Sequence, residues 1–209
     1  MKFTIFISVF TFLFAGCKSE SGKVSSEPSS KEEVNRTVIE LNDSLSSYAD
    51  LNLALLNPDK VGALHFREGE FEEFPLEIFQ FKNLRILDLN MNQIKVLPEE
   101  ISILTKLEKL DLSYCSLEYL PESIGSLQNL KSLLLLENDI DSLPESIGSL
   151  RQLEKLHLGN NPIKKLPQSI GMIENLSILI LGYDGEKSFS EAEKKNIKSL
   201  LPGCSIVFL

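Results

Sequence analysis

The chain has 209 residues and a formal net charge of −9, because 30 Asp and Glu outnumber 21 Lys and Arg. Nucleic-acid binding rests on neutralising phosphates with basic side chains, so this acidic balance argues against that class of partner. The three cysteines, Cys17, Cys115 and Cys204, cannot all pair, and their spacing fits neither a disulfide framework nor a zinc site. We therefore expect no nucleic-acid partner, no metal and no cofactor.

Residues 1–16 have the pattern of a secretory signal peptide, with Lys2, an apolar run over residues 3–15 and small residues before Cys17. The apolar run is shorter than the roughly 20 residues that a membrane-spanning helix needs. The junction LFAGC, residues 13–17, resembles the lipobox of bacterial lipoproteins. This resemblance implies that Cys17 is acylated and becomes the first residue of the mature protein. An ordinary signal peptide beside an incidental cysteine is the alternative.

Residues 17–36 are expected to be the lipidated cysteine and a flexible tether. The segment 18–36 is rich in Ser, Glu and Lys and has no aromatic residue, so it cannot bury enough apolar area to offset the cost of ordering. Lys18 follows the cysteine, and resemblance to lipoprotein sorting rules then favours the outer membrane. The domain is expected on the cell surface or on the periplasmic face of that membrane.

Residues 37–60 are predicted to form an amphipathic capping helix. Apolar residues recur at spacings of three and four from Val38 to Leu55. Asn57 precedes Pro58 and is disfavoured in helical geometry, which ends the helix. The apolar stripe would cover the open end of the repeats that follow. A helix lying on the membrane is the alternative, although the segment lacks the Lys/Arg face of such helices.

Residues 61–184 contain six copies of a 23-residue repeat. The copies begin at Val61, Leu84, Leu107, Leu130, Leu153 and Leu176. Apolar residues at positions 4 and 6 alternate with polar residues, which predicts a short strand with one buried face. Position 9 is occupied by Asn92, Cys115, Asn138 and Asn161, and asparagine there can satisfy backbone groups inside the coil. Position 15 is proline, which suits the start of a short helical turn. No copy can bury its apolar side chains alone, so the copies must stack.

The pattern LxxLxLxxNxIxxLPxxIGxL resembles the leucine-rich repeat family in its 23-residue bacterial form. The resemblance implies a right-handed α/β solenoid, with a parallel sheet on the concave side and short helical turns on the convex side. Residues 185–209 are expected to form a C-terminal cap. Within it, residues 190–193 have the pattern of a capping box before a helix, and residues 204–209 read as a terminal strand.

The repeats offer no catalytic constellation. His65 and His157 both fall at position 5, but four strands of about 4.8 Å spacing would separate them by about 19 Å. They cannot share a proton or a metal ion. Cys115 replaces the asparagine of the ladder and is expected to be structural, and Cys204 is expected to be buried in the cap. No known nucleophile, phosphate-binding or metalloprotease motif occurs, so we expect a non-enzyme.

Binding is then expected on the solvent-facing side of the strands, at positions 3, 5, 7 and 8. The candidate ligand-binding residues are Asp88, Lys109, Asp111, Tyr114, Leu134, Leu136, Lys155 and His157. Leu134 and Leu136 should face solvent beside Tyr114, and exposed apolar clusters flanked by charge often mark binding sites. The alternative is that two exposed leucines are ordinary, or that the tether shields them. Ile178 and Ile180 are expected to serve the nearby cap.

These observations lead to the hypothesis of a monomeric, lipid-anchored protein-protein interaction module at the bacterial cell envelope or surface. The partner is an unidentified protein, with host and matrix proteins among the candidates. Six strands of four residues give a sheet of about 300 Å², against about 800 Å² per partner in a standard interface. Loops must therefore contribute, or many anchored copies must act together. The alternative is a structural protein that organises the envelope without a soluble or host ligand.

Overall fold

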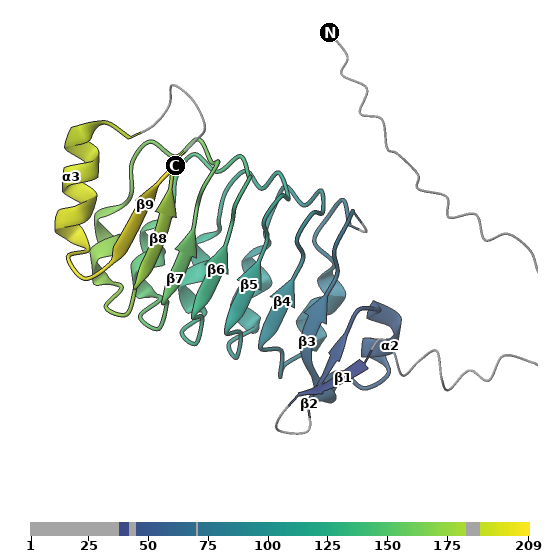
Figure 1. The fold of residues 1–209 in the computed structure, drawn as a ribbon. Coiled ribbons are helices and arrows are strands. Elements are labelled where there is room, and N and C mark those ends of the chain that lie inside the picture. The colour runs from purple at the N-terminus through teal and green to yellow at the C-terminus, as the bar shows by residue number, and fades with distance from the viewer. Residues whose placement is uncertain (1–37, 42–44, 70, 183–188) are drawn as a thin grey trace, which may run out of the picture.

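The structure, a computed structural model, describes residues 38–41, 45–69, 71–182 and 189–209 (Figure 1). The predicted signal peptide, Cys17 and the tether lie outside these residues and stay predictions. No helix in the described part of the chain is long and apolar enough to cross a membrane.

The described residues form one open sheet of nine strands, in which spatial order follows chain order from β1 to β9 (Figure 1). The strands are β1 (Val38–Leu41), β2 (Leu45–Tyr48), β3 (Val61–His65), β4 (Ile86–Asp88), β5 (Lys109–Asp111), β6 (Ser132–Leu134), β7 (Lys155–His157), β8 (Ile178–Leu181) and β9 (Ser205–Phe208). Only β1 and β2 pair antiparallel. From β3 to β8 each strand pairs in parallel with the equivalent residues of the next repeat, as Leu87 does with Leu110. The predicted repeat frame is confirmed.

Five 3-10 helices cover the convex side, one for each complete repeat. They are η2 (Leu76–Gln80), η3 (Glu99–Ile103), η4 (Glu122–Ser126), η5 (Glu145–Ser149) and η6 (Gln168–Met172). Each follows a proline whose φ lies near the value that its ring fixes, for example −71° at Pro98 and −68° at Pro144. The chain therefore winds as a right-handed α/β solenoid, as predicted.

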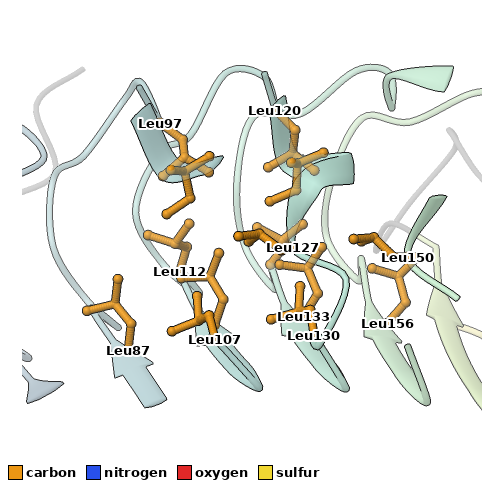
Figure 2. Close-up of a cluster of buried hydrophobic side chains, with 14 of the residues drawn as sticks. Leu87, Leu97, Leu107, Leu112, Leu120, Leu127, Leu130, Leu133, Leu150 and Leu156 are labelled. Carbon is orange, nitrogen blue, oxygen red and sulfur yellow. The ribbon is translucent and has the colours of Figure 1, made fainter. Parts of the chain in front are cut away.

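The core lies between the sheet and these helical turns, and leucine dominates it. Figure 2 shows side chains of successive repeats stacked in rows, such as Leu87, Leu133 and Leu156 from the strands and Leu97 and Leu120 from the convex side. All these side chains are buried. Because every repeat contributes to one continuous core, truncating one such leucine to alanine would cost about 2–5 kcal/mol.

Asparagines at position 9 link neighbouring coils through buried hydrogen bonds. The Asn138 Nδ2 donates to the Leu112 carbonyl of the previous coil at 2.8 Å, and its Oδ1 accepts from the Leu117 amide at 2.7 Å. Asn92 and Asn161 make equivalent bonds. Each side chain thereby satisfies backbone groups that the coil interior would leave unpaired.

Cys115 takes the place of asparagine in one coil and makes only part of this pattern. Its thiol donates to the Leu89 carbonyl at a distance of 3.1 Å. A thiol offers no amide oxygen, and the next residue, Ser116, takes a left-handed φ of 60°. Burial raises the pKa of Cys115 to about 11, so the thiol is protonated at neutral pH.

The prediction of a single capping helix over residues 37–60 is wrong. The described part of this segment contains strands β1 and β2, and only α2 (Leu51–Leu55) and the turn η1 (Pro58–Lys60) are helical. The Asp50 carboxylate accepts from the Leu53 amide at 3.0 Å, so the helix begins only at Leu51.

Sheet pairing explains this difference. Strand β2 lies parallel to β3, with Ser47 beside Ala63 and Tyr48 beside Leu64. This pairing satisfies the backbone edge of the first repeat and buries Tyr48 in the core. Apolar residues that recur every three or four positions favour a helix. Here the hydrogen bonds gained by pairing with the open edge of β3 outweigh that local preference.

The C-terminal cap contains the predicted helix and strand. Helix α3 (Glu191–Leu200) begins with a complete capping box, in which Ser190 Oγ accepts from the Glu193 amide and the Ser190 amide donates to Glu193 Oε2 at 2.9 Å. Phe189 packs against Phe208 of β9 with ring centroids 6.1 Å apart. The cap therefore covers the last coil from the convex side, while β9 extends the sheet.

Candidate functional site

Equivalent positions of the repeats form rows across the concave face, because the strands pair in register. The row at position 5 runs through His65, Asp88, Asp111, Leu134, His157, Ile180 and Val207. The row at position 3 runs through Ala63, Ile86, Lys109, Ser132, Lys155, Ile178 and Ser205. The row at position 5 changes from charged at β4 and β5 to apolar at β8 and β9, whereas the row at position 3 mixes polar and apolar residues along its length.

The charged end centres on Asp88, whose side chain is fully buried. The Arg67 Nε donates to Asp88 Oδ2 at 2.9 Å, with a second bond from Nη2, and the His65 Nδ1 lies 3.6 Å from the same oxygen. The Asn90 amide donates to Oδ1 at 3.2 Å. Burial alone would raise the pKa of Asp88, but these hydrogen bonds and the Arg67 charge outweigh it and hold the pKa below its ordinary value. A ligand at this end would meet the guanidinium of Arg67, which is more than half exposed, before it met the carboxylate.

Asp111 occupies the equivalent position of the next coil. Its side chain is buried as well, and its Oδ1 accepts from the Ser113 amide at 3.1 Å. Lys109 lies two residues before it and is half-buried. The buried carboxylates of Asp88 and Asp111 thus lie on adjacent strands in this row, and the more exposed side chains of Arg67 and Lys109 lie beside them.

Tyr114, Leu134 and Leu136 lie together in the middle of the face. The Tyr114 amide donates to the Leu136 carbonyl at 2.8 Å, so the two residues are held on adjacent coils. Tyr114 has a left-handed φ of 57° and an exposed side chain. Leu134 and Leu136 are half-buried rather than fully exposed. Their proposed role in ligand binding stays a prediction.

The expectation that the cap accounts for Ile178 is wrong. Strand β9 lies beside β8 in the sheet instead of crossing over it, so Ile178 remains 39% exposed and Ile180 half-buried on the concave face. Val207 and Leu209 add exposed fractions of 44% and 55% at the same end. We use the name apolar patch for Leu134, Leu136, Ile178, Ile180, Val207 and Leu209.

Two glycines at position 7 make room for Leu209 on this face. A Cβ on Gly182 would lie 2.6 Å from the Leu209 amide nitrogen, and a Cβ on Gly159 would lie 2.7 Å from Leu209 Cδ1. Earlier coils carry side chains at this position, such as Arg67 and Leu136. The glycines in the last two coils are the sequence signal that could have shown that the terminal strand contributes to the face.

His157 and Lys155 interrupt the apolar patch between Leu134 and Ile180. Burial, and then the charge of Lys155, lower the pKa of His157. The Gly159 amide donates to His157 Nδ1 at 3.2 Å, which requires the neutral ring with its proton on Nε2. At neutral pH the patch is therefore interrupted by one cation rather than two.

A second exposed apolar cluster lies away from the concave face. Val96 and Tyr119 form an isolated parallel bridge between adjacent coils, and both side chains are exposed. Leu76 and Val96 also line a hollow of about 420 Å³ with Phe74 and Pro98. This cluster was not among the sequence-derived candidates.

The described residues contain neither a metal-binding cluster nor a reactive cysteine. No group of three or more His, Cys, Asp or Glu side chains is placed to hold a metal ion within that part of the chain. Burial raises the pKa of Cys204, as it does that of Cys115. Both thiols are therefore poor nucleophiles at neutral pH.

Two family profiles match the chain, "Leucine-rich repeat region" over residues 110–201 and "Leucine Rich repeats (2 copies)" over residues 82–122. Among solved structures, a leucine-rich repeat protein of Leptospira interrogans is 34% identical, with a TM-score of 0.57, over 72% of this chain and 43% of that one. The plant peptide hormone receptor RGFR1, solved in complex with RGF2, is 27% identical, with a TM-score of 0.59, over 82% of this chain and 28% of that one. The chain thus spans less than half the length of either protein. No curated protein matches the sequence.

Proposed function

We propose that this chain, which belongs to the leucine-rich repeat proteins, binds a protein partner through the apolar patch on its concave face. One observation carries the proposal: Ile178, Val207 and Leu209 stay exposed together on one face of the sheet. Contiguous exposed apolar side chains with a charged rim are typical of interaction surfaces. The role is recognition, with no catalytic step assigned to the chain.

The rim defines the chemistry of the partner. Tyr114 offers an amphipathic side chain at one border of the patch, and aromatic residues of this kind often dominate binding energy. Arg67 and Lys109 lie farther along the face, beside the buried carboxylates of Asp88 and Asp111. The partner is therefore a protein with an apolar anchor flanked by polar and acidic side chains.

The second element of the proposal is attachment to the bacterial outer membrane through acylated Cys17. It is supported by the apolar run, the small residues and the cysteine within residues 1–17. Dense anchoring of many copies would raise the effective concentration of a face that is small for a standard interface. The RGFR1 structure in complex with RGF2 supports a recognition role, since a protein of this fold holds a partner there.

The proposal is tested by capture of envelope, host and matrix proteins on the purified chain, followed by mass spectrometry. Leu134→Asp combined with Val207→Asp places charge in the apolar patch and is expected to reduce capture of the specific partner at least about tenfold. Val96→Asp is the matched control, because it charges an exposed apolar residue outside the concave face. Equal capture by wild type and the patch variant would contradict the proposal.

A further inference from the structure

Strand β9 is the outermost strand at the C-terminal end of the sheet, and one of its edges has no partner among the described residues. The Ser205 amide donates to the Ser177 carbonyl at 2.8 Å, and the Leu209 amide donates to the Leu181 carbonyl at 2.7 Å. Successive residues of a parallel strand alternate in which neighbour they bond. Ile206 and Phe208 therefore direct their N–H and C=O groups away from β8.

This edge lacks the features that usually discourage pairing. Protective edges carry lysine, proline or a bulge, whereas β9 reads Ser-Ile-Val-Phe and pairs with β8 in unbroken register. Val207 on its concave side is 44% exposed. The outward N–H and C=O groups of β9 can therefore pair with another strand.

Two lysine side chains of α3 lie beside β9 on the convex side of the edge. The Lys194 and Lys198 ammonium groups lie over the Phe208 ring, 5.7 Å and 6.0 Å from its centroid. Lys194 is paired with Glu191 at 2.8 Å. Lys198 forms no ion pair with any residue that the structure describes, so its charge is available beside β9.

We propose that the β9 edge takes up an extended segment of a partner protein as an additional strand. The outward groups of Ile206 and Phe208 supply the main-chain hydrogen bonds, as in other cases of strand addition. Successive side chains of the added strand face opposite sides of the sheet. Apolar side chains would lie beside Val207, and acidic side chains would lie beside Lys198.

A partner segment fits this edge better than a second copy of the chain. Figure 1 shows α3 at the same end of the solenoid as β9, so two copies paired edge to edge would bring two α3 helices, with their lysines, together on the convex side. A single strand brings no such helix. This site adjoins the apolar patch at Val207, but the main-chain pairing of β9 does not depend on the proposed concave-face function.

The test uses a blocked synthetic peptide of alternating valine and glutamate, with a valine–lysine peptide as the opposite-charge control. The ¹⁵N-labelled protein is titrated with each peptide, and amide exchange is followed at Ile206 and Phe208. The acidic peptide is expected to slow exchange at both amides. The basic peptide is not, although the chain's net charge of −9 would favour it over the whole surface.

Two pairs of variants separate the contributions. Ile206→Pro removes an outward amide that β8 does not use and should weaken binding at least about tenfold, whereas Ile206→Ala keeps that amide and should bind nearly as wild type. Lys198→Glu should weaken binding about fivefold, and Lys60→Glu, the same charge change on an exposed lysine of η1 at the other end of the solenoid, should not.

Three results would overturn the proposal. The first is equal binding of the acidic and basic peptides. The second is a response confined to residues of the apolar patch such as Leu134. The third is slow exchange at Ile206 and Phe208 in the protein alone, together with sedimentation as a dimer, which would identify a second copy as the occupant.

Discussion

Leu209 lies directly against Gly182, so closely that a Cβ on this glycine would stand 2.6 Å from the Leu209 amide nitrogen. Gly182 also has a backbone φ of 116°, which residues that carry a side chain rarely adopt. The path of the backbone at the end of β9 therefore depends on the absence of a side chain at Gly182, just as the Leu209 side chain depends on its absence at Gly159.

Replacing Gly182 with alanine should displace the end of β9 and lower the free energy of unfolding by about 2–4 kcal/mol, since it adds both overlap and backbone strain. Urea unfolding followed by circular dichroism measures the change. Gly203→Ala is the control, because a Cβ on Gly203 would have no atom within 4 Å and its φ lies outside the left-handed region. Equal midpoints for the two variants would show that Leu209 does not require Gly182.

Cys115→Asn should stabilise the chain by about 1 kcal/mol, because it restores an amide oxygen to a buried ladder. The gain requires Ser116 to leave its left-handed conformation. The equivalent residues of two asparagine coils, Gln93 and Asp139, have a negative φ. Thermal unfolding compares this variant with Asn138→Cys, which makes the reverse change one coil later and should be destabilising. A lower midpoint for Cys115→Asn would mean that the coil has adapted to the thiol.

The buried Asp88 carboxylate predicts a loss of stability in acid. Its pKa lies below the ordinary value in the folded protein, so the unfolded chain takes up the proton first as the pH falls. The stabilising contribution is present at neutral pH and is lost from about pH 4 downward, through the folded pKa. Asp88→Asn should cost about 1–2 kcal/mol at pH 7, a modest value because Arg67 is more than half exposed.

Urea midpoints measured across the acid range provide the check. The difference between wild type and Asp88→Asn should shrink as the pH falls below about 4. Glu118→Gln removes an exposed carboxylate from a neighbouring coil and serves as the control. A difference that stays constant with pH would exclude ionised Asp88 as its cause.

Attachment through Cys17 predicts incorporation of a labelled fatty acid when the full chain is made in bacteria. Cys17→Ala should abolish the label, whereas Cys204→Ala should leave it unchanged, because Cys204 lies in the cap. Mass spectrometry of the purified chains measures the acyl mass. Label that survives Cys17→Ala would contradict the anchor.

The repeats could be predicted from the sequence because each copy must bury the same apolar positions against its neighbours. The spacing of Leu84, Leu107 and Leu130 therefore determines register, strand and turn together. The N-terminal segment was different. There the apolar spacing favoured a helix, but the open edge of β3 recruited β2 through Ser47 and Tyr48, a tertiary effect that no local pattern contains.

The candidate site was predicted only in part for a related reason. Period-two alternation correctly placed Leu134 and His157 on the concave side, but it could not show that Asp88 is fully buried under Arg67. Nor could it show that β9 would join the sheet at its edge and leave Ile178 exposed. Burial of a polar group and exposure of an apolar one both depend on what the neighbouring coil provides.

Site-specific photo-crosslinking can show whether a partner occupies the apolar patch. A photoreactive amino acid is placed in turn at Leu134, Val207 and Val96, and the crosslinked products are identified by mass spectrometry. We expect one common partner protein at Leu134 and Val207 and its absence at Val96, which lies off the concave face. Crosslinks to that partner from Val96 alone would contradict it.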